Sequence, residues 1–260
     1  MRNLVVTNQK GGVGKTVYSV HQAAALVDMG KKVLFIDLDT QRNSSKTIKK
    51  FGAVTLGCAS SLFLDSDFST SILDQVAQAD KDVNLFLIEG DSVMADVARA
   101  DPKVMVNYKR NLAAVTDAFD FAVVDTAPSL SIAMSGALIA ANYVISPIEL
   151  EEYSIDGVTD MLKTIFGVRQ KWNPDLVFLG MFPNRFNPRS ERQKETLAQL
   201  LENYAHLVIP AKIGLRASIP EALAEGIPVW KLRKTSAREA AKEFAEVLEI
   251  VFKKMEVGSE

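Results

Sequence analysis

Short apolar segments alternate with longer amphipathic segments along almost the whole chain. The apolar segments are rich in β-branched and aromatic residues, which favours buried strands of a parallel sheet over fragments of helix. They occupy residues 4–6, 33–36, 83–88, 121–124, 143–148, 177–182 and 207–209. Strands that alternate with helices need crossover connections, and these connections place helices on both faces of the sheet. The pattern therefore predicts an α/β fold with a mostly parallel, twisted sheet.

Three amphipathic segments carry clear helix signals. They are residues 16–29, 190–204 and 236–255. The first ends before Gly30, a residue that suits the left-handed position after a helix. The second begins with Ser190 as a candidate N-cap, with Glu191 and Gln193 as possible capping partners. The third has apolar residues at helical spacing, and its polar side carries acidic residues, so we interpret it as a helix that packs on the core.

The chain has no internal repeat, low-complexity tract or linker rich in proline, glycine and serine. We therefore expect residues 1–260 to form a single domain. The segment from 51 to 82 has the least regular pattern. It is interpreted as a lid or as a peripheral helical insertion.

The composition excludes several classes of protein. Hydrophobic residues make up 48% of the chain and charged residues 24%, which is ordinary for a soluble globular protein. The lone Cys58 excludes an intramolecular disulfide and a four-cysteine metal site within one chain, and we expect it to be a buried structural thiol. There is no apolar run of membrane-spanning length and no basic, apolar leader at the N-terminus, so the expected location is cytoplasmic. His21 and His206 are isolated and are interpreted as structural.

Residues 8–16 read NQKGGVGKT and lie between a predicted strand and a predicted helix. A phosphate-binding loop of the form G-x-x-x-x-G-K-[ST] needs this context, although its first glycine would fall at Gln9. Glycines let backbone N–H groups face an anion, Lys15 can reach the β- and γ-phosphates, and the Thr16 hydroxyl can bind Mg²⁺. The predicted ATP-binding residues of this loop are Lys10, Gly11, Gly12, Val13, Gly14, Lys15, Thr16 and Val17.

Carboxylates follow two of the predicted strands. Asp125 ends the apolar segment 121–124 and, after a phosphate loop, is the expected carboxylate for the metal. Asp37 and Asp39 follow the second strand, and alternation along an extended chain would put both on the same side. The predicted Mg²⁺ residues are Thr16, Asp39 and Asp125.

Three motifs resemble those of one family. Residues 10–16, KGGVGKT, look like the deviant Walker A motif K-G-G-x-G-K-[ST] of the ParA/MinD family of ATPases. Residues 37–41, DLDTQ, resemble its D-x-D-P-Q element, with Thr40 where proline is usual. Residues 125–130, DTAPSL, resemble its D-[CT]-P-P-S-L switch, with alanine for the first proline. This motif begins at Lys10 and does not require glycine at position 9, so Gln9 is compatible with a phosphate loop of this family.

The resemblance implies an ATP-dependent homodimer in which two subunits pack face to face. The signature lysine, here Lys10, would reach across to the partner's phosphates, as an arginine finger supplied in trans does. The implied catalytic residues are Lys10, Lys15, Asp39 and Asp37. Asp39 would position the attacking water, and Asp37 would orient the switch. ATP and Mg²⁺ are the implied cofactors.

The resemblance also implies a base pocket. Asn184 lies where the family has its adenine-reading residue, and the guanine-reading NKxD pattern is absent because Asn187 follows in place of aspartate. The predicted pocket residues are Asn184, Arg185, Pro210, Ile219, Pro220 and Glu221.

Within the family, the ParA type fits better than the MinD type. The net charge of -2 argues against a wholly basic nucleic-acid binder, but basic residues gather between positions 185 and 238. They fit a surface for the phosphate backbone of non-specific DNA. The predicted DNA-binding residues are Arg189, Arg216, Lys234 and Arg238. A helix with acids on its polar side is unfavourable at an anionic membrane, so no membrane partner is expected.

The expected function is that of a DNA partition ATPase stimulated by a centromere-binding, ParB-like adaptor protein and associated with the nucleoid when ATP is bound. No segment precedes the first strand, so we expect no N-terminal helix-turn-helix domain, and the lone cysteine excludes the nitrogenase iron protein branch. Two alternatives remain open. One is a MinD-like ATPase that positions a membrane or protein cargo, and the other is a metabolic ATP-dependent amidoligase of the same superfamily.

Overall fold

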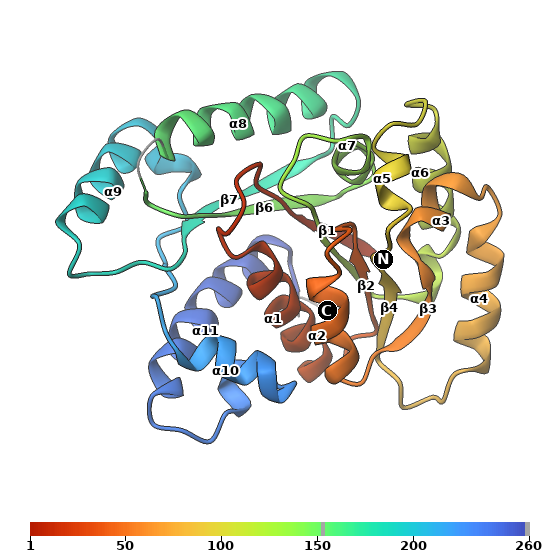
Figure 1. Cartoon of the computed structure of the whole chain (residues 1–260), viewed down its shortest axis with the longest axis horizontal. Helices are drawn as coiled ribbons and strands as arrows, with labels where there is room; N and C mark the ends of the chain where they lie inside the picture. The colour runs from red at the N-terminus through yellow and green to blue at the C-terminus, as the bar shows by residue number, and fades with distance from the viewer. Residues whose placement is uncertain (152–153, 258–260) are drawn as a thin grey trace.

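The computed structural model describes residues 1–151 and 154–257. In this part of the chain, seven parallel strands form one sheet in the order β3-β4-β2-β5-β1-β6-β7 (Figure 1). The strands are β1 (Arg2–Val6), β2 (Val33–Asp37), β3 (Val54–Cys58), β4 (Leu85–Glu89), β5 (Phe121–Asp125), β6 (Tyr143–Ile148) and β7 (Val177–Pro183). The predicted α/β fold with a parallel sheet is confirmed.

Helices cover both faces of the sheet. One layer contains α1 (Lys15–Asp28), α2 (Asn43–Lys50), α10 (Ser218–Glu225) and α11 (Ala237–Lys254), which lie together at the lower left of Figure 1. The other contains α3 (Ala59–Leu64), α4 (Phe68–Gln78), α5 (Met94–Val97), α6 (Val104–Ala114), α7 (Ile132–Ile139), α8 (Ser154–Lys171) and α9 (Glu191–Tyr204). Because neighbouring strand residues face opposite sides, Val123 packs in the first layer and Val124 in the second. The central strands are therefore mostly apolar on both faces.

The predicted helices have the expected ends. Gly30 follows α1 with φ 74°, the left-handed conformation that glycine adopts without steric cost. The Ser190 hydroxyl caps α9 by accepting a hydrogen bond from the Gln193 backbone N–H. The apolar stripe of α11 is buried, with Phe244 and Val251 fully enclosed, so its interpretation as a core helix is confirmed. No described helix is both long enough and apolar enough to span a membrane.

One predicted strand did not form, and one irregular segment contains a strand that was not predicted. Residues 207–209 were predicted as a strand, but they contribute one isolated bridge, between Met181 and Val208. The segment is short and runs into Pro210, which has no N–H to extend a ladder. The segment from 51 to 82, interpreted as a lid or as a peripheral helical insertion, contains the helices α3 and α4 and also supplies the edge strand β3, so it is part of the sheet.

Cys58 also differs from its expectation. It ends β3 and is partly exposed rather than buried, because β3 pairs on one side only. In the described chain it forms no disulfide.

His21 joins α1 to the segment that precedes α11. Its Nδ1 donates to the Val17 carbonyl (2.7 Å) and its Nε2 accepts from the Val229 N–H (3.1 Å), which defines a neutral ring. The ring stacks on Phe244, with centroids 4.2 Å apart, and is fully buried. Burial lowers the pKa of His21 to about 4, from an ordinary value of 6.5. The structural interpretation of His21 is confirmed, whereas His206 lies exposed.

We expect His21 to make the stability of the fold depend on pH. Because its pKa is lower in the folded than in the unfolded state, the unfolded chain binds more protons between pH 6.5 and pH 4. The stabilisation by neutral His21 is complete above this window, and about 3 kcal/mol of it is lost as the pH falls through the window. Urea unfolding at several pH values should show the stability gap between wild type and His21→Leu shrinking by this amount.

The exposed His206 provides the control, since His206→Leu should keep the wild-type pH dependence. If the difference in unfolding free energy between wild type and His21→Leu stays constant with pH, His21 is not the source of the pH dependence.

Candidate nucleotide-binding site

The phosphate loop lies between the end of β1 and the start of α1, where the unpaired N–H groups of a helix N-terminus attract anions (Figure 1). Gly12 and Gly14 adopt φ values of 79° and 90°. A Cβ on Gly14 would lie 1.9 Å from Asn184 Nδ2, so this position needs glycine for space as well as for backbone conformation. The loop thus has the geometry predicted from its sequence.

Two polar side chains hold the start of the loop in place. Asn8 is buried, its Nδ2 donates to the Pro147 carbonyl (2.9 Å) and its Oδ1 accepts from the Lys10 N–H (2.9 Å). Gln9 Nε2 donates to Thr164 Oγ1 on α8 (2.8 Å). The residue that stands where the common motif has its first glycine therefore ties the loop to the opposite helical layer.

The two lysines of the loop have different environments. Lys15 is 7% exposed, and its ammonium donates to the Lys10 carbonyl (3.0 Å). Burial lowers the pKa of Lys15, while the charges of Asp125 and Asp39 oppose this effect. Lys10 is exposed, and within the described residues its ammonium has no hydrogen-bond or ion-pair partner. Lys15 therefore belongs to the site's interior, and Lys10 to the molecular surface.

Thr16 and Asp125 meet at the ends of α1 and β5. Thr16 Oγ1 donates to Asp125 Oδ2 at 2.7 Å. Burial raises the pKa of Asp125 to about 7 and the Asp37 charge adds to the rise, whereas the Thr16 hydrogen bond opposes it. Asp125 Oδ1 is buried without a hydrogen-bond partner among the described residues. A cation would relieve the cost of this buried carboxylate.

Asp37 is paired with the N-terminus of α2. Its Oδ2 accepts from the Ser45 N–H (2.9 Å) and the Ser45 hydroxyl (2.6 Å), and its Oδ1 accepts from the Asp39 N–H (3.0 Å). Burial raises the pKa of Asp37, and these hydrogen bonds lower it. Asp37 and Asp39, which alternation is expected to place on the same side, differ in burial. The strand ends at Asp37, so the chain turns and Asp39 lines the cleft while Asp37 is buried.

A cleft of about 810 Å³ opens in front of the loop. This volume is within the range of small-molecule sites. The lining residues that carry its chemistry are Gly11, Gly12, Gly14, Lys15, Thr16, Val17, Asp39, Thr126 and Pro128. Thr16, Asp39 and the buried Asp125 fit Mg²⁺, which prefers oxygen ligands and keeps several waters. Bound Mg²⁺ would neutralise charge on the β- and γ-phosphates.

The far wall of the cleft contains most of the predicted base-pocket residues. Asn184, Arg185, Ile219 and Pro220 line it together with Gly214, Leu215, Arg216 and Ala217. Pro210 and Glu221 do not, since Pro210 is exposed to solvent and Glu221 forms an ion pair with Lys234. Arg185 has φ 56° and pairs with Glu149 at 3.2 Å.

Asn184 has a role in the loop that its motif position did not predict. It is buried, and its Nδ2 donates to the Val13 carbonyl at 2.7 Å. Its backbone N–H donates to the Ile148 carbonyl at 2.7 Å. The amide thus fixes the loop to the carboxyl end of β7, whatever contact its Oδ1 makes with a base.

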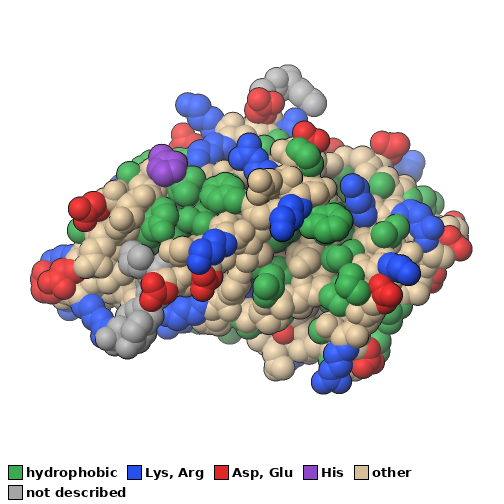
Figure 2. Space-filling view, turned by 90° about the horizontal axis from the view of Figure 1, so that it is seen from above, with side chains coloured by type: hydrophobic (Ala, Val, Ile, Leu, Met, Phe, Trp, Pro, Cys, Tyr) green, Lys and Arg blue, Asp and Glu red, His purple; other side chains and the backbone are tan. Residues whose placement is uncertain are grey.

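The predicted DNA-binding residues fall into two groups. Arg189 and Arg238 are exposed, and no ion pair neutralises them within the described residues. Arg216 pairs with Glu243 (2.7 Å) and Glu239 (3.3 Å), and Lys234 pairs with Glu221. Figure 2 shows one face of the molecule, on which lysine and arginine side chains are spread among apolar and acidic ones.

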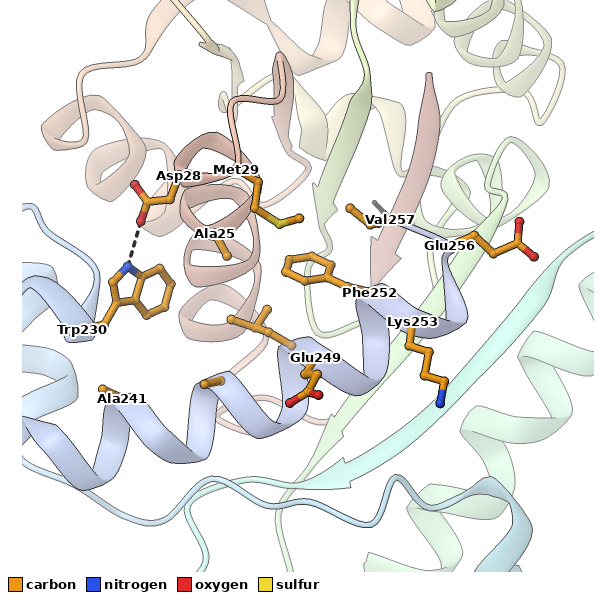
Figure 3. A pocket seen from close by; sticks show the side chains of 12 residues that line it. Ala25, Asp28, Met29, Trp230, Ala241, Glu249, Phe252, Lys253, Glu256 and Val257 are labelled. Carbon is orange, nitrogen blue, oxygen red and sulfur yellow. Dashed lines mark hydrogen bonds between the residues drawn. The ribbon is translucent and has the colours of Figure 1, made fainter. Parts of the chain in front are cut away.

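A second cavity, of about 700 Å³, lies between α1 and α11 (Figure 3). Its lining is mostly apolar, with Met29, which follows α1, next to Phe252 of α11, and Trp230 Nε1 donates to Asp28 at 2.8 Å. None of the motif residues lines it. The chemistry is therefore concentrated in the cleft at the phosphate loop.

The fold and this cleft define a P-loop nucleotide-binding protein. The family model described as an AAA domain matches residues 1–178. Protein IncC of Escherichia coli is 44% identical over 265 residues, covering 99% of this chain and 71% of that protein. The chromosome-partitioning ATPase Soj of Treponema pallidum is 32% identical over 232 residues, 88% of each chain.

A solved structure extends the likeness. Cobyrinic acid a,c-diamide synthase from Mycobacterium smegmatis, with bound ATP analogue and magnesium, has a TM-score of 0.73 at 26% identity, covering 99% of this chain and 96% of that one. The chain belongs to the ParA/MinD family of P-loop ATPases, and it is of the ParA partition type.

Sequence reasoning missed several residues of the site. Asn8, Ser45 and Gly214 carry no motif signal, because their roles depend on which strand ends become neighbours. The one available signal was the position of Ser45 close after DLDTQ, where a short helix could start.

We expect Asn184→Asp to weaken nucleotide binding through the loop and not through the base. The carboxylate would face the Val13 carbonyl without a donor, which typically costs about 1–3 kcal/mol. The affinities for ATP and for inorganic tripolyphosphate, measured by calorimetry, should both fall about tenfold. Asn203→Asp is the matched control, since exposed Asn203 on α9 also donates from Nδ2 to a backbone carbonyl, that of Gln199, but does not line the cleft. Unchanged tripolyphosphate affinity in Asn184→Asp would leave base recognition as the main role.

Proposed function

We propose that this chain hydrolyses ATP in a nucleotide-sandwich dimer, binds non-specific DNA as that dimer, and is reset by a centromere-binding, ParB-like adaptor. The relatives named above support partition as the setting. One observation carries the dimer: of the two loop lysines, Lys15 is buried at the site and Lys10 is exposed without a partner in the described structure. An exposed cation beside a phosphate site is available to a second subunit.

Each residue of the site then has a distinct role. Lys15 and the loop N–H groups hold the phosphates, and Thr16, Asp125 and Asp39 hold Mg²⁺. Asp39 positions the attacking water, while Asp37 orients the turn that carries Asp39 through its bond to the Asp39 N–H. Lys10 of one subunit stabilises charge that develops on the phosphates of the other. Asn184, Arg185, Ile219 and Pro220 form the wall for the base.

We further propose that residues 1–260 act as one domain, because both cores share the same sheet. The proposed location is cytoplasmic, with nucleoid association in the ATP-bound state. No membrane partner is proposed, since the apolar stripe of α11 is already buried. ATPase rates measured with DNA, with anionic lipid vesicles and with neither would separate partition from membrane positioning and from a metabolic ligase.

Lys10→Ala is expected to bind ATP with wild-type affinity, because Lys10 contributes no side-chain contact to its own site. It should lose ATP-dependent dimerisation, measured by light scattering, and DNA-stimulated hydrolysis should fall about 10³-fold. Lys81→Ala removes another exposed lysine, remote from the loop motif, and should behave as wild type. Wild-type hydrolysis in Lys10→Ala would refute the sandwich.

DNA binding should depend steeply on salt. The logarithm of affinity falls roughly linearly with the logarithm of salt concentration, with a slope of about -0.9 for each phosphate contacted. Arg189→Ala and Arg238→Ala should each reduce the magnitude of this slope by about 1, because these two side chains are available to bind phosphates. Arg110→Ala on α6 is the control and should leave the slope unchanged. Salt-insensitive binding by the ATP-bound protein would exclude this surface.

A further inference from the structure

Two buried polar atoms at the edge of the nucleotide site lack hydrogen-bond partners among the described residues. They are Ser44 Oγ and Asp125 Oδ1, and both residues are 1% exposed. In native proteins the large majority of buried polar side-chain atoms are hydrogen-bonded. A hydroxyl and a carboxylate oxygen left unpaired near the same site therefore need an explanation.

The chain places Ser44 between two acidic groups. It is the second residue of α2 and directly precedes Ser45, which binds Asp37. Asp37 and Asp125 are register partners on the neighbouring strands β2 and β5. Ser45 contacts Asp37, and Asp125 lies opposite Asp37 in the sheet, so the adjoining Ser44 lies beside this pair of acids.

The existing hydrogen bonds decide which acid needs the hydroxyl. Asp37 already accepts three, from the Asp39 N–H and from the N–H and hydroxyl of Ser45. Asp125 accepts one, from Thr16, and its Oδ1 has none in the described structure. A serine hydroxyl has one hydrogen to donate, so it can serve one carboxylate at a time. Asp125 accepts fewer hydrogen bonds than Asp37, so it is the carboxylate that needs the Ser44 hydroxyl.

We propose that Ser44 is a positioning residue of the magnesium site, whose hydroxyl supplies the second hydrogen bond that fixes the Asp125 carboxylate when Mg²⁺ is bound. This inference rests on the proposed function of the cleft and adds a residue to it. With Thr16 on Oδ2 and Ser44 on Oδ1, the carboxylate is held from both sides. Partners that orient metal-binding groups in this way typically change metal affinity about 10–100-fold when removed.

A purely structural role predicts a different outcome. The Ser44 hydroxyl bonds no backbone group in the described chain, so Ser44→Ala deletes an unpaired polar atom and should not lower the melting temperature. A structural serine would instead show its effect in stability and leave metal affinity alone. Metal affinity and stability together therefore separate the two roles.

The test is calorimetric titration of MgCl₂ into the full chain saturated with a non-hydrolysable ATP analogue. Ser44→Ala should raise the Mg²⁺ dissociation constant about 10–100-fold, with the metal-free affinity for the analogue unchanged. Ser44→Thr retains a hydroxyl and should restore most of the affinity. Ser60→Ala removes another buried serine, on α3 and away from the cleft, and should match wild type.

Two negative results have different meanings. Wild-type Mg²⁺ affinity in Ser44→Ala, beside a wild type that binds the ion, would overturn the role of Ser44 and leave the proposed function standing. A wild-type analogue complex that bound no Mg²⁺ would overturn the proposed function of the cleft, and the Ser44 inference with it.

Discussion

The site depends on two carboxylates buried at adjacent strand ends. Asp37 and Asp125 are register partners on β2 and β5, both are almost completely enclosed, and burial raises the pKa of each. Two like charges in a region of low dielectric are tolerated when hydrogen-bond donors and cations surround them. This requirement accounts for the arrangement around them. The Ser45 N–H at the start of α2 donates to Asp37, and the Thr16 hydroxyl donates to Asp125. The buried Lys15 ammonium interacts electrostatically with the Asp125 carboxylate.

Most of the fold could be predicted from the sequence because its strands are buried on both faces. Such strands are short, continuous apolar runs, and six of the seven observed ones were predicted. The edge strand β3 was missed because its sequence, VTLGC, is not a continuous apolar run and includes Gly57 at a register shift. The failed strand at 207–209 shows the converse: an apolar run ending at proline formed a single bridge, because pairing depends on N–H groups as well as on hydrophobicity.

The site could be predicted where a motif fixes local geometry and not where tertiary contacts decide it. The strand–loop–helix context of residues 10–16 is sufficient to predict the roles of Gly14, Lys15 and Thr16. The sequence could not show that Asn184 would donate to the Val13 carbonyl, because β7 and the loop are far apart in the chain. It also could not show that the turn after β2 buries Asp37 and leaves Asp39 in the cleft.

The far wall of the cleft is attached to α11 through one acidic residue. Glu243 accepts from the Gly214 N–H (2.9 Å) and pairs with Arg216, and both of these partners line the cleft. A guanidinium held by two carboxylates loses those interactions if it turns to a DNA phosphate, so its net gain from the phosphate is small. Arg189 and Arg238 have no such competitor in the described structure. Of the four basic residues chosen from sequence, Arg216 therefore suits the nucleotide wall, while Arg189 and Arg238 suit a DNA surface.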